Sequence, residues 1–124
     1  MSSPGEDGRA RRGRAVEARV AAWLAGRGFT ILDRNFRTRR GEIDIVAREG
    51  ETLVFVEVRS RRADSPWSPE ASVDAGKRMR IARAAAEWLR RHGDGDRPCR
   101  FDVIAVRVGE GRLRIHHVRG AFTL

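Results

Sequence analysis

The spacing of hydrophobic and polar residues divides the chain into two helices and five strands. Apolar side chains recur every three or four residues over 9–26 and about 71–92, the period of an amphipathic helix. Shorter apolar and β-branched runs between glycine- or proline-containing turns predict strands at 29–36, 42–48, 52–59, 99–108 and 112–122. The order α-β-β-β-α-β-β favours a mixed sheet flanked by two helices.

The two most apolar strands, 42–48 and 52–59, each contain a carboxylate where a buried strand normally has none: Asp44 and Glu57. A two-residue turn at Gly50-Glu51 fits a hairpin, with glycine at the first central position. Strand side chains alternate between two faces. This turn therefore leaves one face of the hairpin wholly apolar, to pack on the core, and places Asp44 directly opposite Glu57 on the other face.

Two facing carboxylates on an apolar hairpin need compensation. Directly opposed strand residues have Cβ atoms about 4.5–5.5 Å apart, and their neighbours Val46 and Phe55 make solvation of the two charges worse. A proton on one acid, a bridging arginine or a divalent cation would each relieve the repulsion. Simple pairing of both acids with the abundant arginines is the alternative. Oxygen ligands converging from two strands suit Mg²⁺ or Mn²⁺, and we favour this interpretation.

Two further charged residues have two interpretations each. Glu17 lies at the edge of the apolar stripe of the first helix, where spacing alone favours a pair with a neighbouring arginine. If that helix packs over the hairpin, Glu17 becomes a third oxygen ligand. Arg59 follows Glu57 on the same face, and the hairpin register pairs it with Glu42. Its functional interpretation is stabilisation of a phosphate or of a charged transition state.

The composition indicates one basic domain. The chain has 124 residues, a formal charge of +9 and one cysteine, which excludes a disulfide framework within the chain and a multi-cysteine zinc site. Residues 1–8 are small and polar, so we expect a disordered tail before a single domain at 9–124. There is no run typical of a signal peptide or a membrane span, so we expect a cytoplasmic protein and no membrane partner.

The charge suggests a polyanionic partner, with nucleic acid first and a membrane surface second. Basic residues precede the acidic hairpin and follow it, and the register brings both groups to the same end, beside the acids. Such a layout fits a phosphodiester backbone led to a metal site, whereas solvated turns are the alternative. These residues are Arg37, Arg39, Arg40, Arg61 and Arg62.

An Asp on one strand followed by Glu-x-basic on the next resembles the PD-(D/E)xK nuclease superfamily, and the helical glutamate resembles its Holliday junction resolvase branch. The segments "GRAVEARVAAWLAGRGFTILDRNFR", "GEIDIVA", "LVFVEVRSR" and "RFDVIAV" are similar to the YraN-like family, bacterial proteins predicted to be nucleases. The resemblance covers nearly the whole chain. It implies a restriction-endonuclease-like fold and an Mg²⁺- or Mn²⁺-dependent endonuclease acting on structured or branched DNA.

The resemblance also implies roles for individual residues. Glu17, Asp44 and Glu57 match the metal-binding acids, and Arg59 falls where the superfamily has lysine. Arginine stays protonated and cannot act as a general base. Lys77, the only lysine of the chain, is expected either to supply the missing ammonium or to contact phosphate.

Other outcomes stay open. A catalytically inactive nucleic-acid-binding module would keep the same fold and basic surface, and a basic protein bound to RNA or the ribosome is a third hypothesis. A homodimer would suit cleavage of two strands of a junction, although no residue pattern indicates one. Asp102 lies within an apolar strand, where we expect a structural salt bridge with an arginine.

Overall fold

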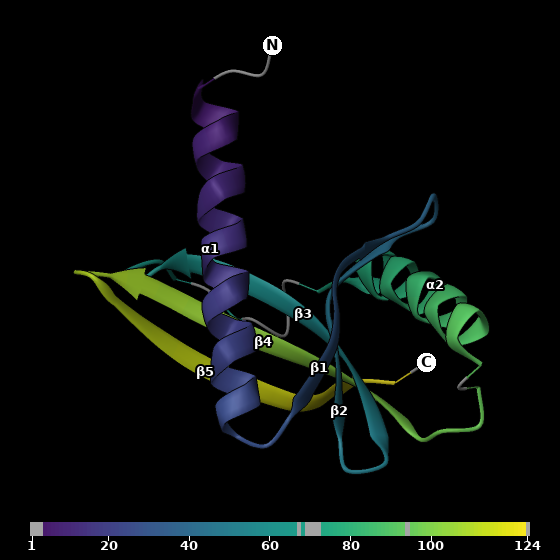
Figure 1. The fold of residues 1–124 in the computed structure, drawn as a ribbon. Helices are drawn as coiled ribbons and strands as arrows, with labels where there is room; N and C mark the ends of the chain where they lie inside the picture. Colours follow the sequence, from purple (N-terminus) through teal and green to yellow (C-terminus); the bar gives the residue numbers. More distant parts are fainter. Residues whose placement is uncertain (1–3, 67, 69–72, 94, 124) are drawn as a thin grey trace.

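The computed structural model of the chain describes residues 4–66, 68, 73–93 and 95–123, with side chains from Gly13 onward. The element order is the predicted one (Figure 1). The helices are α1 (Pro4–Gly26) and α2 (Ala75–His92), and the strands are β1 (Thr30–Arg37), β2 (Glu42–Glu49), β3 (Thr52–Arg62), β4 (Cys99–Gly109) and β5 (Arg112–Phe122).

The element ends differ from the prediction by more than one residue at three places. Helix α1 begins at Pro4, whereas the sequence places a disordered tail up to residue 8. Helix α2 begins at Ala75, because Asp74 caps its first turn, and the predicted start at 71–72 lies outside the described residues. Strand β3 continues to Arg62, where it still pairs with β4.

A single mixed sheet in the order β1-β2-β3-β4-β5 forms the middle of the molecule. Strands β3 and β4 are parallel and are connected through α2, whereas the other neighbours are antiparallel. This is the mixed sheet with flanking helices that the order of elements predicts. None of the described helices is long and apolar enough to cross a membrane.

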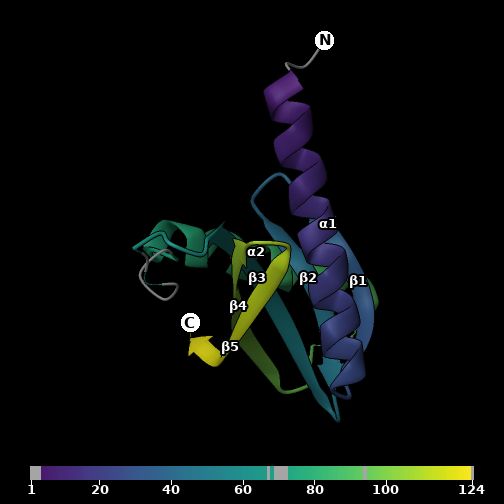
Figure 2. The same ribbon diagram turned by 90° about the vertical axis from the view of Figure 1, so that its left-hand side faces the viewer.

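The two helices cover opposite faces of the sheet (Figures 1 and 2). Val54 and Val56 of β3 pack in one buried cluster with α1, whereas Leu53 and Phe55 pack in another with α2. The ring of Phe55 meets that of Trp88 at 6.1 Å between centroids. The expectation of a single core-facing side of the hairpin is therefore wrong, because α2 buries the acid-bearing face as well.

Strands β2 and β3 part at Asp44. From Glu49–Thr52 to Ile45–Val56 the hairpin has the predicted register. The ladder ends there, short of the expected pairs of Asp44 with Glu57 and Glu42 with Arg59. Instead, the backbone N–H of Val58 donates to Asp44 Oδ2 at 2.7 Å. The carboxylate thus replaces a backbone acceptor, and the β1–β2 hairpin diverges from β3 (Figure 1).

The turn between β1 and β2 rests against α2 through a close backbone approach. A Cβ atom on Gly41 would lie 1.9 Å from the backbone oxygen of Arg80 in the second turn of α2. Thr38 closes the turn, since its N–H donates to Gly41 O at 2.8 Å and its hydroxyl accepts from Gly41 N at 3.1 Å. Glycine at position 41 therefore fixes where the diverging hairpin lies relative to α2.

Candidate functional site

Three carboxyl groups meet where β2 and β3 part. Asp44 occupies the fork, close enough to Glu57 on β3 and to Glu17 on α1 for its charge to raise the pKa of both. The helix that carries Glu17 does pack over the hairpin, which was the condition for its joining the two strand acids. The structure therefore brings the three predicted acids together, although Asp44 and Glu57 are not paired in the ladder.

Glu57 is the most buried of the three, with 4% of its surface exposed. Its Oε1 lies 3.4 Å from Lys77 Nζ and 3.7 Å from the Arg59 guanidinium. Its Oε2 is buried and receives no hydrogen bond from any donor within the described part of the chain. A buried carboxylate oxygen without a donor is costly, so this atom is available for a ligand.

The cluster resists full ionisation. Burial, followed by the nearby Asp44, raises the pKa of Glu57 to about 8 in spite of Lys77. Burial and Asp44 likewise raise the pKa of Glu17 to about 7, against the opposing charges of Arg34 and Arg37. Burial also raises the pKa of Asp44, although the Val58 N–H favours its ionised form. At neutral pH these groups must share protons or acquire a cation.

Lys77 reaches this cluster from the first turn of α2. Its backbone N–H donates to the capping carboxylate of Asp74 at 2.9 Å, and its side chain turns back toward β3. A cation at a helix N-terminus is opposed by the helix dipole, and the ion pair with Glu57 offsets that cost. The structure thus places the one lysine of the chain beside Glu57, where Arg59 also lies.

Sequence reasoning missed Asn35. With its nitrogen turned toward α1, its side-chain amide donates to both oxygens of Glu17, at 2.9 and 3.1 Å. No hydrophobic pattern marks this position. The only indication in the sequence is that Asn35 is its sole asparagine and that it contains no glutamine.

The donor set fits a hard divalent cation in part. Asp44 and Glu57 present oxygen ligands from neighbouring strands, Glu57 Oε2 has no donor among the described residues, and the surplus negative charge is buried. Among the described side chains, no three His, Cys, Asp or Glu residues are already arranged around a common ion position. The two strand acids are therefore the core of the candidate site, and Glu17 joins it through Asp44.

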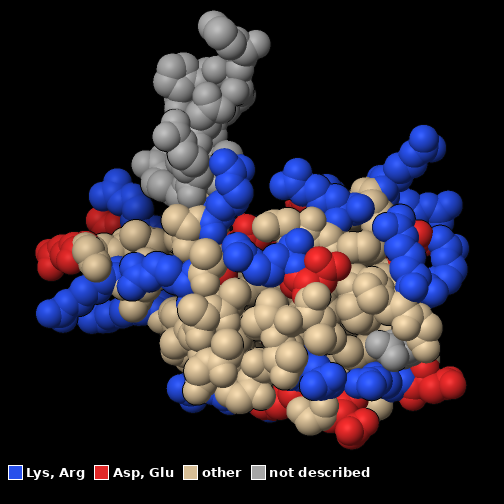
Figure 3. Space-filling view, viewed as in Figure 1, with Lys and Arg blue, Asp and Glu red and all other residues tan. Residues whose placement is uncertain are grey.

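The divergence of the strands also separates the basic residues. Arg39 and Arg40 face α2 across an open groove with a volume of about 610 Å³. From α2 this groove, which we call the α2 groove, is lined by Arg83, Glu87, Arg90 and Arg91. Arg37 and Arg80 line a smaller hollow beside it. Figure 3 shows Lys and Arg gathered near α2 and, separately, at the opposite end of the sheet.

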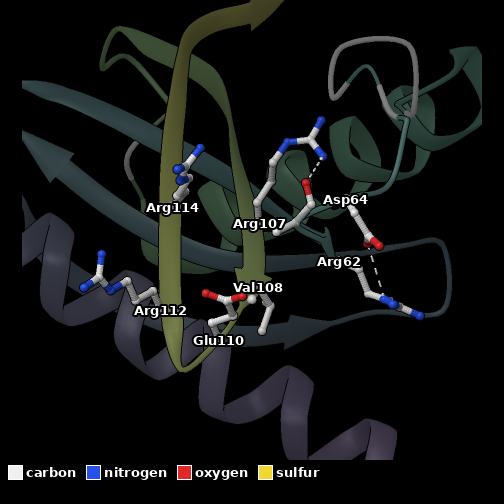
Figure 4. A pocket seen from close by; sticks show the side chains of 9 residues that line it. Arg62, Asp64, Arg107, Val108, Glu110, Arg112 and Arg114 are labelled. Carbon is white, nitrogen blue, oxygen red and sulfur yellow. Dashed lines mark hydrogen bonds and ion pairs between the residues drawn. The ribbon is translucent and has the colours of Figure 1, made fainter.

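The second basic surface lies where β3 and β4 end and β5 begins. We call it the strand-end groove; it has a volume of about 530 Å³ and is lined by Arg62, Asp64, Arg107, Glu110, Arg112 and Arg114 among others. Arg107 turns to the loop after β3, where it donates to Ala63 O at 3.4 Å (Figure 4) and to Ser65 O at 2.7 Å. The expected single basic cluster at one end of the hairpin is therefore wrong, because the β1–β2 turn and the end of β3 carry their arginines to different grooves.

Asp102 lies apart from the three acids, in a fully paired position. It is fully buried, and its carboxylate accepts hydrogen bonds from the Arg100 side chain at 2.8 and 3.1 Å and from Gly120 N at 2.9 Å. It also contacts His117 Nε2 at 2.6 Å. Burial alone would raise its pKa, but these partners outweigh burial and lower the pKa to about 2. The expected salt bridge with an arginine is confirmed, and the role of Asp102 is structural.

Comparison with known proteins places the chain in a family. The sequence model of the uncharacterised protein family UPF0102 matches residues 16–106. The chain belongs to this family. The UPF0102 match spans all three acids and Lys77, and the expected likeness to YraN-like proteins is consistent with it.

Curated relatives carry the same family name. A UPF0102 protein of Anaeromyxobacter dehalogenans is 53% identical over 116 residues, which cover 94% of this chain and 87% of the relative. A UPF0102 protein of Moorella thermoacetica is 47% identical over 116 residues, which cover 92% of this chain and 97% of the relative. The similarity therefore extends across nearly the whole fold.

Proposed function

We propose that the protein is a metal-dependent endonuclease that hydrolyses phosphodiester bonds in structured or branched DNA. The observation that carries this proposal is the meeting of three buried or half-buried carboxyl groups beside Lys77, with a buried oxygen of Glu57 that no donor in the described part of the chain reaches. Asp44 and Glu57 would hold Mg²⁺ or Mn²⁺, with Glu17 as the third acid. The resemblance to PD-(D/E)xK nucleases supports the same assignment.

The cation, when bound, supplies positive charge against the phosphate and activates water as the nucleophile. The chain itself supplies two more cations. Lys77 and Arg59 both lie beside Glu57 Oε1, so either can donate to a phosphate oxygen as charge develops there. Arg59 stays protonated, which limits it to charge stabilisation. The apolar side chains of Val46 and Phe55 keep the surroundings dry, which strengthens each of these interactions.

The basic grooves supply the proposed DNA contacts. Arg39 and Arg40 of the α2 groove and Arg62 of the strand-end groove are suited to phosphate oxygens, since a net charge of +9 favours a polyanion. Binding of this kind is sequence-independent and depends strongly on salt. The DNA contacts of Arg37 and Arg61 belong to the same proposal.

The test is cleavage of junction, flap and single-stranded DNA by purified protein, with Mn²⁺ or with EDTA, alongside Asp44→Asn. The proposal expects cleavage by the wild type in Mn²⁺, none in EDTA, and none by Asp44→Asn. Asp96→Asn, at an exposed acid before β4 and outside both grooves, is the matched control and should cleave like the wild type. Cleavage that persists in Asp44→Asn would assign the activity to another site or to a contaminant.

A nucleic-acid-binding module without cleavage is the second candidate function. Arginine at position 59, where the superfamily has lysine, and the lack of a ready-made three-ligand arrangement among the described residues both favour it. In the same experiment, salt-dependent binding by wild type and Asp44→Asn, with no cleavage by either, would select this alternative.

A further inference from the structure

The backbone of Asn35 is unusual for a strand residue. Its φ angle is 53°, which lies in the left-handed region, although the residue is inside β1. Its neighbours Arg34 and Phe36 pair with Ile45 and Ile43, so Asn35 lies at the register position opposite Asp44. The local twist in β1 therefore occurs beside the residue at which β2 parts from β3.

This conformation turns the amide toward α1. In the amide orientation that sets a donor against the acid, the one nitrogen donates to both carboxyl oxygens of Glu17 and so holds that group in place. Asparagine adopts left-handed backbone more readily than other residues with a side chain, but glycine would do so at lower cost. A strained residue at a functional position indicates that its side chain is needed there.

We propose that Asn35 is a positioning residue that holds the Glu17 carboxyl group against Asp44 so that Glu17 can serve as the third acid of the cation site. The proposal rests on the proposed function for its purpose and on the Asn35–Glu17 contact for its mechanism. Asn35 itself touches neither cation nor DNA in this account, and it acts only through Glu17.

Asn35→Gly separates the amide from the backbone, since glycine keeps the left-handed φ without strain and removes the two hydrogen bonds. Glu110→Gly is the matched control for Mn²⁺ affinity alone: Glu110 has a φ of 48° in the turn between β4 and β5, where it lines the strand-end groove away from the acids. This control measures how relief of a left-handed backbone angle changes Mn²⁺ affinity when no contact with Glu17 is lost. Asn35→Asp keeps the size of the side chain but presents an acceptor where Glu17 needs a donor, so this variant should also lose Mn²⁺ affinity.

The first measurement is Mn²⁺ affinity by calorimetry or electron paramagnetic resonance. Loss of an outer partner of a metal ligand typically weakens binding about 10- to 100-fold. Asn35→Gly should show a loss of this size, Glu110→Gly should show none, and Asn35→Gly added to Glu17→Ala should cause no further loss. Wild-type affinity in Asn35→Gly, or multiplication of the two losses in the double variant, would overturn the proposal while leaving the proposed function intact.

The second measurement is urea unfolding in EDTA of the wild type, Asn35→Gly, Glu17→Ala and the double variant. The proposal expects the double variant to change the unfolding constant by less than the product of the single changes, since both substitutions break one contact. If the wild type binds no Mn²⁺, the proposed function fails, and this cycle still decides the contact. If the changes in the unfolding constant caused by the two single substitutions multiply in the double variant, Asn35 does not position Glu17.

Discussion

Burial gives the carboxyl cluster its unusual chemistry. Glu57 would be an ordinary acid on a wet surface, but under α2 its ionisation leaves a charge with one oxygen unsatisfied. Asp102, only one strand away, is even more buried and behaves in the opposite way, because arginine, histidine and backbone donors surround it. The contrast between the two residues shows that the donors around an acid, and not burial alone, distinguish an unsatisfied site from a structural one.

The raised pKa of Glu57 makes metal-free protein less stable in alkali. Below the unfolded-state pKa of about 4.5, Glu57 is protonated in both states. As pH rises toward the folded-state value of about 8, the unfolded chain ionises first, so stability falls through this window. Glu57→Gln should remove a cost on the order of a few kcal/mol at pH 9 and none at pH 4. Urea unfolding in EDTA at both pH values measures this.

The exposed Glu51, in the turn of the same hairpin, provides the control for Glu57. Glu51→Gln should leave the pH dependence of unfolding unchanged. An equal loss of stability between pH 4 and pH 9 in wild type and Glu57→Gln would contradict the assignment of that cost to Glu57.

Asp102 should show the reverse pH dependence. Its pKa is lowered from 3.8 to about 2, so its stabilising contribution is present above pH 4 and is lost as pH falls toward 2. Asp102→Asn breaks a buried ion pair and should cost about 3 kcal/mol at pH 7. Chemical denaturation between pH 2 and pH 7 checks both statements. Wild-type stability of Asp102→Asn at pH 7 would contradict a structural role for this ion pair.

At the scale of elements, the turn between β1 and β2 fixes the hairpin that carries Asp44. Gly41→Ala would place a Cβ atom 1.9 Å from Arg80 O, so the turn must move away from α2. We expect a loss of about 2 kcal/mol in stability, as for other overpacked sites, together with weaker Mn²⁺ binding. Gly26→Ala is the control, because the added Cβ atom would meet no other described part of the chain within 4 Å, and this variant should unfold like the wild type.

Periodicity and turn chemistry were sufficient to predict the order of the elements and the register of the β2–β3 hairpin next to its turn. Ile45–Val56 and Glu49–Thr52 pair as the two-residue turn requires. The divergence at Asp44 was not predictable in this way, because it depends on a side chain that replaces a backbone acceptor. Ile43 consequently packs with α2 while Ile45 packs with α1, although alternation gives them the same face.

Tertiary packing also decided which residues completed the candidate site. The sequence identified Glu17, Lys77 and Arg59 as charged residues with two interpretations each, and only the placement of α1 and α2 against the sheet brought them to Asp44 and Glu57. Asn35 could not be found from pattern at all, since its importance depends on a left-handed backbone angle.

At the scale of the whole molecule, the sheet carries two separate basic grooves. If the α2 groove binds phosphates, Arg39→Ala with Arg40→Ala should lower the slope of log affinity against log salt by roughly 2 for duplex DNA. Arg14→Ala with Arg19→Ala, at exposed positions on α1 outside both grooves, removes the same charge and should change the slope less. Equal slopes for the two double variants would remove the α2 groove from the DNA-binding surface.

The central claim is that the fork between β2 and β3 is a cation site. The most direct measurement is the anomalous difference density of crystals grown at pH 8 with saturating MnCl₂. We predict a peak within coordination distance of the Asp44 and Glu57 carboxylates, about 2.0–2.5 Å, which disappears in Glu57→Gln. Manganese bound elsewhere, with Lys77 still paired to Glu57 and no density in the fork, would contradict the account.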